Sequence, residues 1–220
     1  MKKYISYIGL AILSTILFSC NKDSFNYKPG YVGISKITYF PAINTNGDHL
    51  VIIKQGDAYT DQGATAKLNG ADFKYQTTGT VDSNTPGVYS ISYSGTNPDG
   101  FSASDFRTVV VIGNDVSGND FSGKYARTSN GSVAIWTKVS NGVYTVSNPG
   151  GAPGTNLIVT VVNYTGKKIT IPKQPANDGT LTSSASEATV SGTVAGTLAQ
   201  YSMIIVNGGY GASLRTFVKQ

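Results

Sequence analysis

Side chains that could carry catalytic or metal chemistry are scarce in this chain. Its 220 residues include one His, His49, and one Cys, Cys20. A zinc site needs several His or Cys ligands, so none can be assembled from these two residues. A lone imidazole beside a turn is more often a solvated or hydrogen-bonded residue than a catalyst. The sequence also contains no nucleophile elbow and no triad order. We therefore predict a protein that is not an enzyme and that uses no metal and no cofactor.

Carboxylates offer two further kinds of chemistry, and the sequence favours neither. Glycosidases use a pair of carboxyl groups, one with a pKa raised by burial, but the Asp residues of this chain nearly all lie in turn sequences. Clustered Asp oxygens could also bind Ca²⁺, although their spacing matches no calcium loop. Because Asp is at home in turns, solvated turn carboxylates are the better interpretation. The Asp residues considered for Ca²⁺ are Asp57, Asp61, Asp82 and Asp99.

A β-hairpin is predicted around the dipeptide Asn141-Gly142, which is flanked by apolar-rich segments at 132–139 and 143–147. Asn-Gly is the strongest short-range hairpin signal, because both central residues of a type I′ turn need a positive φ. In a two-residue loop Ser140 pairs with Val143, and the register of both strands follows. The core face predicted by this register contains Val133, Ile135, Thr137, Val139, Tyr144 and Val146.

The same register gives the one specific binding-site hypothesis. It places Trp136, the only Trp, on the opposite face together with Lys138 and Thr145. Sugar rings stack on indoles through their C–H faces, so these three residues could contact a glycan. The alternative is that Trp136 is covered by a loop, by the first domain or by the interior of a barrel, because Trp is highly buried on average.

The composition indicates a β-sheet protein with a neutral polar surface. Charged residues make up 13% of the chain, against a usual share of about 25%. The 14 Tyr, together with many Thr and Val, favour pleated sheets over helices. Strands are predicted at 50–54, 64–68, 73–77, 87–94, 102–112, 132–139, 143–147, 157–163, 167–171, 189–194, 198–206 and 213–218. We expect an all-β fold, with an N-terminal β-sandwich and a second antiparallel β-domain that is either a small barrel or a sandwich.

The N-terminal segment has the organisation of an export signal. Lys2 and Lys3 precede an uncharged, largely apolar stretch at 4–18, which is shorter than the roughly 20 residues of a membrane span. It ends at Leu17-Phe18-Ser19-Cys20, which resembles the lipobox of bacterial lipoproteins. The resemblance implies that residues 1–19 are a signal peptide, that Cys20 carries a covalent lipid, and that residues 20–29 form a tether. An ordinary secretory signal with a coincidental Cys is the alternative.

Residues 30–115 resemble a known bacterial domain. Within 87–94, Tyr89, Ile91 and Tyr93 alternate onto one predicted core face. Around them lie the segments Gly56-Asp57-Ala58-Tyr59-Thr60-Asp61-Gln62-Gly63-Ala64-Thr65-Ala66, Gly79-Thr80-Val81-Asp82, Thr85-Pro86-Gly87-Val88, Asp99-Gly100 and Thr108-Val109-Val110-Val111. In this order they are similar to the bacterial Ig-like domain first described beside a pesticidal crystal protein. The resemblance implies a noncatalytic β-sandwich that serves as a spacer or adhesion module.

Residues 116–220 differ in charge from the preceding domain. Asp residues outnumber Lys and Arg at 30–115, whereas Lys and Arg predominate after 116. The basic residues are spread thinly, so nucleic acid is rejected as a partner. The segments Phe121-Ser122-Gly123-Lys124-Tyr125 and Gly142-Val143-Tyr144 resemble C-terminal barrel-like domains of Bacteroidota lipoproteins encoded near polysaccharide-uptake machinery. The loops at 148–156 and 172–180 are long enough to shape a pocket.

Three functions follow as hypotheses. The leading one is a noncatalytic lipoprotein, anchored by lipid in the outer membrane and facing the cell surface or the periplasm, that binds glycan as an accessory to polysaccharide uptake. The second is a structural or adhesion lipoprotein whose C-terminal domain contacts an outer-membrane protein partner. The third is a carrier that holds a small ligand inside a C-terminal barrel.

Overall fold

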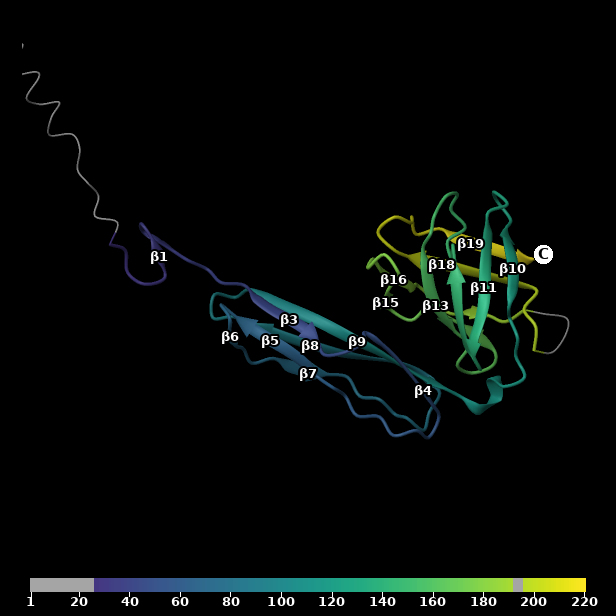
Figure 1. The fold of residues 1–220 in the computed structure, drawn as a ribbon, viewed down its shortest axis with the longest axis horizontal. Helices are drawn as coiled ribbons and strands as arrows, with labels where there is room; N and C mark the ends of the chain where they lie inside the picture. The colour runs from purple at the N-terminus through teal and green to yellow at the C-terminus, as the bar shows by residue number, and fades with distance from the viewer. Residues whose placement is uncertain (1–25, 192–195) are drawn as a thin grey trace, which may run out of the picture. The chain divides into compact units, whose positions relative to one another are not determined.

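The computed structural model describes residues 26–191 and 196–220 of the chain (Figure 1). The predicted signal peptide, Cys20 and part of the predicted tether therefore lie outside the described residues. Contacts divide the chain into two units with a boundary between Tyr39 and Phe40. In the part of the chain that is described, no helix is long and apolar enough to span a membrane. The described elements are strands apart from one short 3-10 helix, which confirms the all-β fold class; the predicted domain bounds stay predictions.

The first described unit holds a small hairpin. Strand β1 (Tyr31–Val32) pairs antiparallel with β2 (Ser35–Lys36), and the side chains of both strands are exposed. These residues fall within the segment predicted to open the Ig-like domain.

A two-sheet sandwich occupies residues 41–112 of the second unit. One sheet contains β3 (Pro41–Thr45), β5 (Ala64–Leu68) and β6 (Ala71–Asp72), and the other has the order β4 (Leu50–Lys54), β9 (Ser102–Ile112), β8 (Gly87–Thr96) and β7 (Gln76–Thr78). The core between them takes Ile91 and Tyr93 from β8, with Tyr89 packed against it, which confirms the predicted face of this strand. Of the segment predicted as a strand at 73–77, only its end belongs to β7.

Strand β4 lies at the edge of its sheet and pairs parallel with β9. Its side chains alternate between two cores. Val51 and Ile53 pack against the sandwich core, whereas Leu50 and Ile52 pack against a second buried cluster. That cluster combines residues of β9 and η1 (Asn114–Val116) with residues of the C-terminal sheet: Val110, Ile112, Val116, Val143, Val162 and Tyr164. The continuous apolar run at 50–53 thus has both faces covered.

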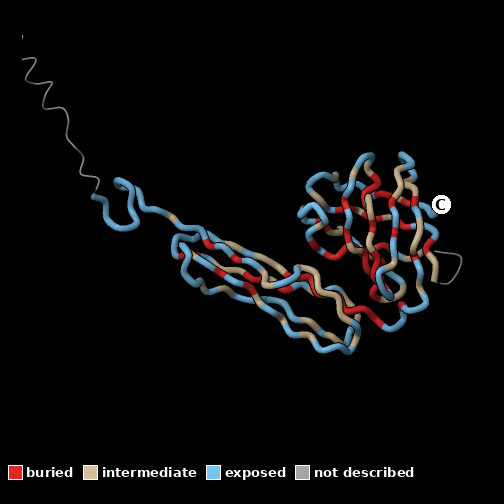
Figure 2. Tube along the Cα trace, in the orientation of Figure 1, coloured by how far each residue is buried: buried red, intermediate tan, exposed pale blue. Residues whose placement is uncertain are grey.

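One eight-stranded antiparallel sheet forms the C-terminal fold, in the order β13-β12-β11-β10-β19-β18-β16-β15. Its strands are β10 (Gly123–Arg127), β11 (Val133–Ser140), β12 (Val143–Ser147), β13 (Ile158–Val162), β15 (Gln174–Pro175), β16 (Leu181–Ser184), β18 (Gln200–Val206) and β19 (Leu214–Lys219). A small sheet of β14 (Lys168–Ile169) and β17 (Ala188–Thr189) accompanies it. Most residues of the buried core belong to the strands of the curved sheet, as the red parts of the tube show (Figure 2). Between the two alternatives, this single curled sheet favours the barrel.

Side-chain amides connect the two end strands of this sheet. The Gln174 side chain of β15 accepts a hydrogen bond from the Thr160 N–H of β13 at 2.9 Å and donates one to the Thr160 carbonyl at 2.7 Å. Asn177, which follows β15, makes a similar contact with β13, because its Oδ1 accepts a hydrogen bond from the Ile158 N–H at 2.6 Å. The amide of Gln174 thus occupies the place that a strand backbone would take in a closed barrel.

The variant Gln174→Ala is expected to lower the free energy of unfolding by about 1–3 kcal/mol, because it leaves the Thr160 N–H and carbonyl without their partners. Urea denaturation followed by circular dichroism measures this change. Gln200→Ala, at an exposed position of β18, is the matched control and should change stability little. Equal losses in the two variants would show that Gln174 does not hold the end strands together.

The predicted hairpin is confirmed, but the predicted turn type and the predicted faces of its first strand are wrong. Ser140 pairs with Val143 as expected. Gly142 has a φ of +73°, whereas Asn141 is not among the residues with positive φ, so the turn is not type I′. A β-bulge between Lys138 and Ser140 leaves Val139 unpaired and shifts the register by one residue. Such a slip moves every side chain of a strand to the other face of the sheet.

Candidate binding cleft

The register shift separates the three residues predicted to contact a glycan. Trp136 lies opposite Val146 and Lys138 opposite Tyr144, so both are on the inner face, whereas Thr145 lies opposite Thr137 on the outer face. Trp136 is only 2% exposed. The prediction of an exposed Trp136 platform is therefore wrong, and the alternative of a Trp inside the barrel is the observed arrangement.

Aromatic packing and one hydrogen bond hold Trp136 in the interior. Its Nε1 donates to the hydroxyl of Tyr201 at 3.1 Å. Its ring centroid lies 5.2 Å from that of Tyr201, 5.6 Å from Tyr144 and 5.7 Å from Tyr125. Burial raises the pKa of Tyr201, so its hydroxyl stays protonated. The indole is thus a core residue, and no sugar ring can stack on it in this structure.

Lys138 has a structural contact of its own. Its Nζ donates to the carbonyl of Asn119 at 2.7 Å, and the side chain of Asn119 in turn donates to Asn163 Oδ1 at 2.8 Å. These bonds attach the segment after η1 to the end of the barrel.

The predicted turn carboxylates accept hydrogen bonds close by in the chain. Asp57 accepts from the Lys54 N–H at 3.1 Å, and Asp82 accepts from the Asn84 N–H at 2.9 Å. His49 is also hydrogen-bonded, with Nδ1 2.8 Å from the Phe106 carbonyl oxygen. Within residues 26–191 and 196–220, His, Cys, Asp and Glu form no cluster of three that could hold a metal ion.

Asp61 differs from these carboxylates because it also forms an ion pair with a buried arginine. It pairs with the guanidinium of Arg107, which is 1% exposed, and accepts hydrogen bonds from the hydroxyls of Tyr93 and Tyr59 at 2.8 and 3.0 Å. Burial opposes ionisation of Asp61, but the two tyrosine hydroxyls and the charge of Arg107 together lower its pKa. This ion pair, which belongs to the core of the sandwich, was not predicted from the sequence.

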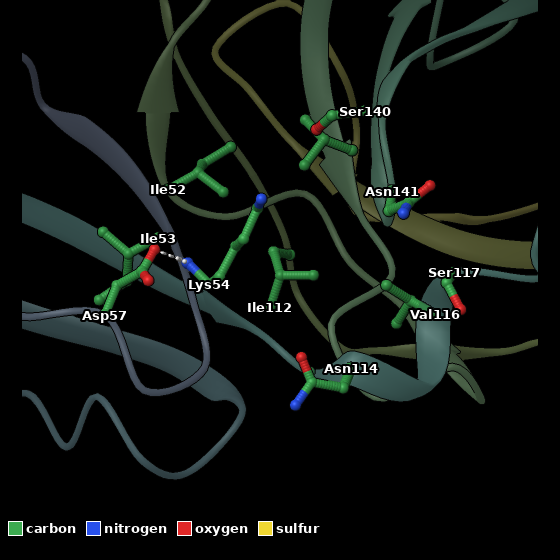
Figure 3. Close-up of a pocket in the computed structure, with 12 residues that line it drawn as sticks. Ile52, Ile53, Lys54, Asp57, Ile112, Asn114, Val116, Ser117, Ser140 and Asn141 are labelled. Carbon is green, nitrogen blue, oxygen red and sulfur yellow. Dashed lines mark hydrogen bonds between the residues drawn. The ribbon is translucent and has the colours of Figure 1, made fainter.

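A cleft of about 610 Å³ lies where the second buried cluster reaches the surface (Figure 3). Its apolar lining comes from both parts of the unit, with Ile52 from β4, Ile112 from β9, Val116 from η1 and Val143 from β12. A volume of this size is typical of small-molecule sites, which combine an apolar surface with a few polar groups.

The polar lining of the cleft consists of amides, hydroxyls and one pair of opposite charges. The charges belong to Lys54 and Asp57, and in Figure 3 the Lys54 side chain extends into the space that the lining residues enclose. The neutral polar groups are those of Asn114, Ser117, Ser140 and Asn141. Since the two charges balance, the lining favours a neutral polar ligand.

Close backbone packing positions the cleft. The N–H of Gly113 donates to the Tyr164 carbonyl at 2.9 Å. A Cβ at Gly142 would lie 2.7 Å from the Asn163 carbonyl oxygen and 3.0 Å from a Val116 methyl group. The absence of a side chain at Gly142, together with its positive φ, lets the hairpin turn pack against η1 and the end of β9.

This cleft was not predicted from the sequence. Its residues come from segments around positions 52–57, 112–117 and 140–143, and no local motif connects them. The available signal was the continuous apolar run at 50–53, which is typical of a strand with both faces covered.

Comparison with known proteins gives a partial assignment. No curated protein matches the chain. Among solved structures, a lipoprotein from Bacteroides thetaiotaomicron is 22% identical with a TM-score of 0.35, covering 82% of this chain and 100% of that one. The M60 catalytic domain of Clostridium perfringens ZmpB with its CBM51-1 and CBM51-2 domains is 13% identical with a TM-score of 0.31, covering 84% of this chain and 21% of that one. At such TM-scores neither structure indicates a function here.

The family comparison concerns the sandwich. Residues 43–111 match the family model of the Ig-like domain of bacterial surface proteins. The matched segment holds the strands from β3 to β9, so it coincides with the two-sheet sandwich apart from its outermost residues. The Ig-like part of the resemblance is thereby confirmed: this segment of the chain is similar to the Ig-like domains of bacterial surface proteins.

Proposed function

We propose that this chain is a noncatalytic lipoprotein, anchored by lipid in the outer membrane, whose cleft binds a neutral glycan. The observation that carries the proposal is the lining of the cleft. Its apolar side suits the C–H face of a sugar ring, and its amides and hydroxyls suit the hydroxyl groups of a sugar. This role moves from the face of Trp136 to the cleft, because the indole is buried.

The anchor and the spacer rest on separate evidence. The lipobox-like sequence ending at Cys20 supports a lipid anchor, and several acyl chains together give stable attachment to a membrane. The match of residues 43–111 to a domain of bacterial surface proteins supports a location at the cell surface. In this proposal the sandwich carries the C-terminal barrel away from the membrane.

Binding of a neutral oligosaccharide is expected to weaken about tenfold in Asn141→Ala and in Lys54→Met, because each variant removes one polar group of the lining. A glycan array of the purified chain would select the oligosaccharide, and isothermal titration calorimetry would then compare the variants. Lys74→Met is the matched control, since it removes an exposed Lys that does not line the cleft. Unchanged affinity in both cleft variants would exclude this site.

A second candidate function has its own observation. The outer face of the C-terminal sheet carries exposed apolar side chains, among them Ile135, Leu214 and Val218. Val133 lies opposite Ala126, which in turn lies opposite Val218. These cross-strand neighbours continue the apolar face from β11 through β10 to β19. A face of this kind suits a protein partner. A blank glycan array with a fully folded chain would favour this function. The small-ligand carrier has less support, since aromatic side chains pack the interior of the barrel.

A further inference from the structure

Two arginines face the interior of the barrel near the start of β19. Arg127 ends β10 and pairs with Phe217, while Arg215 lies two residues before Phe217 on β19 and is 6% exposed. The hydrogen bonds of both guanidinium groups go to backbone carbonyls. Arg127 donates to the Gly151 oxygen at 3.2 Å, and Arg215 donates to the oxygens of Ser213 at 3.0 Å and Gly211 at 3.1 Å.

Neither arginine has a carboxylate partner among the described residues. The sequence after residue 116 contains three acidic side chains, and each has other contacts. Asp120 accepts from the Ser122 N–H, Asp178 accepts from Thr180, and Glu187 pairs with Lys168 at 2.8 Å. Burial, followed by the charge of Arg127, lowers the pKa of Arg215. A buried cation without a counter-ion is costly, so the pair favours an anion from outside the chain.

Two buried polar atoms beside the arginines lack a hydrogen-bond partner in the described structure. They are Nε of Arg215 and the hydroxyl of Tyr210. The Arg215 guanidinium lies 5.1 Å from the centroid of the Tyr210 ring, so both atoms belong to one local cluster. Buried polar groups are nearly always hydrogen-bonded, and an unpaired donor at such a place is typical of a site completed by a water molecule or an ion.

Close packing of the loop at 148–156 forms one wall of this cluster. A Cβ at Gly150 would lie 2.5 Å from the Tyr210 ring, and a Cβ at Gly151 would lie 2.8 Å from Cδ of Arg127. Asn130 Nδ2 donates to the Gly151 carbonyl at 3.0 Å and fixes the loop there. The loop that was expected from the sequence to shape a pocket thus packs against Arg127 and Tyr210.

We propose that Arg127, Arg215 and Tyr210 form a binding site for an oxyanion, a sulfate or carboxylate group of the kind carried by acidic sugars. The planar guanidinium fork matches both groups, and the hydroxyl of Tyr210 supplies a neutral donor. Arg127 is partly exposed and gives the anion its approach. This site is separate from the cleft, so it does not depend on the glycan-binding proposal.

Sulfate binding is expected to be saturable and at least tenfold weaker in Arg127→Met, because one of the two cations is removed. Isothermal titration calorimetry of the full chain with sodium sulfate, against sodium chloride at equal ionic strength, measures it. Lys124→Met, which removes an exposed cation from the same strand, is the matched control and should bind as the wild type does. Tyr210→Phe keeps every charge and tests the hydroxyl, with a several-fold loss expected.

Two further ligands identify the source of the anion. A sulfated disaccharide and galacturonic acid are titrated in parallel, and binding of either one by wild type but not by Arg127→Met assigns the sulfate or the carboxylate as the natural group. Lys74→Met should leave all these affinities unchanged, since Lys74 is exposed and lines neither the cleft nor the arginine cluster. Heats that do not saturate with sulfate, or equal sulfate affinity in Arg127→Met and wild type, would overturn the oxyanion site while leaving the cleft proposal intact.

Discussion

Asp61→Asn is expected to lower the free energy of unfolding by about 3–5 kcal/mol, because it leaves the buried guanidinium of Arg107 without its counter-ion. The remaining partners of Arg107 are all neutral: the hydroxyl of Tyr59 and backbone carbonyls, among them that of Asp48, which accepts from Nε at 3.1 Å. The substitution also weakens the acceptor of two tyrosine hydroxyls, since an amide oxygen accepts less strongly than a carboxylate. Urea denaturation at neutral pH measures the loss.

The pH dependence of the unfolding free energy separates the contribution of the Asp61 charge from that of its packing. The pKa of folded Asp61 is lower than the ordinary value of 3.8. Ionised Asp61 therefore stabilises the fold above that ordinary value, and this stabilisation is lost as pH falls through the folded pKa. The difference in unfolding free energy between wild type and Asp61→Asn should shrink over this acidic range, whereas a packing defect would keep it constant.

Asp72→Asn is the matched control for this ion pair. Asp72 pairs with Lys67 at 2.6 Å, but its side chain is 94% exposed. Water and salt screen such a pair, so the control should change stability little. Similar losses of unfolding free energy in Asp61→Asn and Asp72→Asn would contradict the view that burial of Arg107 makes its ion pair more stabilising than an exposed one.

The fold was largely predictable where one face of a strand meets one core. Tyr89, Ile91 and Tyr93 alternate with small or polar residues, and the structure places all three at the sandwich core. The strand at 143–147 was predicted with its observed bounds, because the Asn-Gly turn marks its start. Period-two patterns identify a face reliably only when the other face is polar.

The faces of β11 were not predictable in this way. Val133, Ile135 and Val139 alternate as a core face would, yet Ile135 is 44% exposed and Val139 62% exposed. Both faces of this strand are partly apolar, so the pattern could not choose between them. The prediction therefore rested on the register expected from the turn. The bulge at Val139, which no sequence signal marked, shifts this register and exchanges the two faces of the strand.

The two candidate sites were beyond sequence reasoning for a physical reason. Each joins residues that are distant in the chain, such as Ile52 and Asn141 in the cleft, or Arg127 and Arg215 in the barrel. Which residues meet depends on how β4 pairs with β9 and β10 with β19. Neither pairing was predictable from the sequence. The excess of basic residues after 116, which leaves the arginines without carboxylates, was visible there.

Trp136→Ala is expected to lower the free energy of unfolding of the barrel by about 3–5 kcal/mol, the usual cost of truncating a large buried aromatic residue. The loss includes ring contacts with Tyr125, Tyr144 and Tyr201, and it leaves the Tyr201 hydroxyl without its donor. Denaturation followed by circular dichroism measures it, since the variant has no Trp for fluorescence.

Two further variants separate the parts of this effect. Trp136→Phe keeps most of the apolar volume and loses the hydrogen bond to Tyr201, so an intermediate loss of about 1–3 kcal/mol is expected. Thr145→Ala, on the outer face of the adjacent strand, should have little effect on stability. If Trp136→Ala were as stable as wild type and yet lost binding to a glycan, the indole would have to be a ligand platform after all. Destabilisation with glycan affinity retained in the folded fraction would instead establish Trp136 as a core residue and leave the cleft as the site to test.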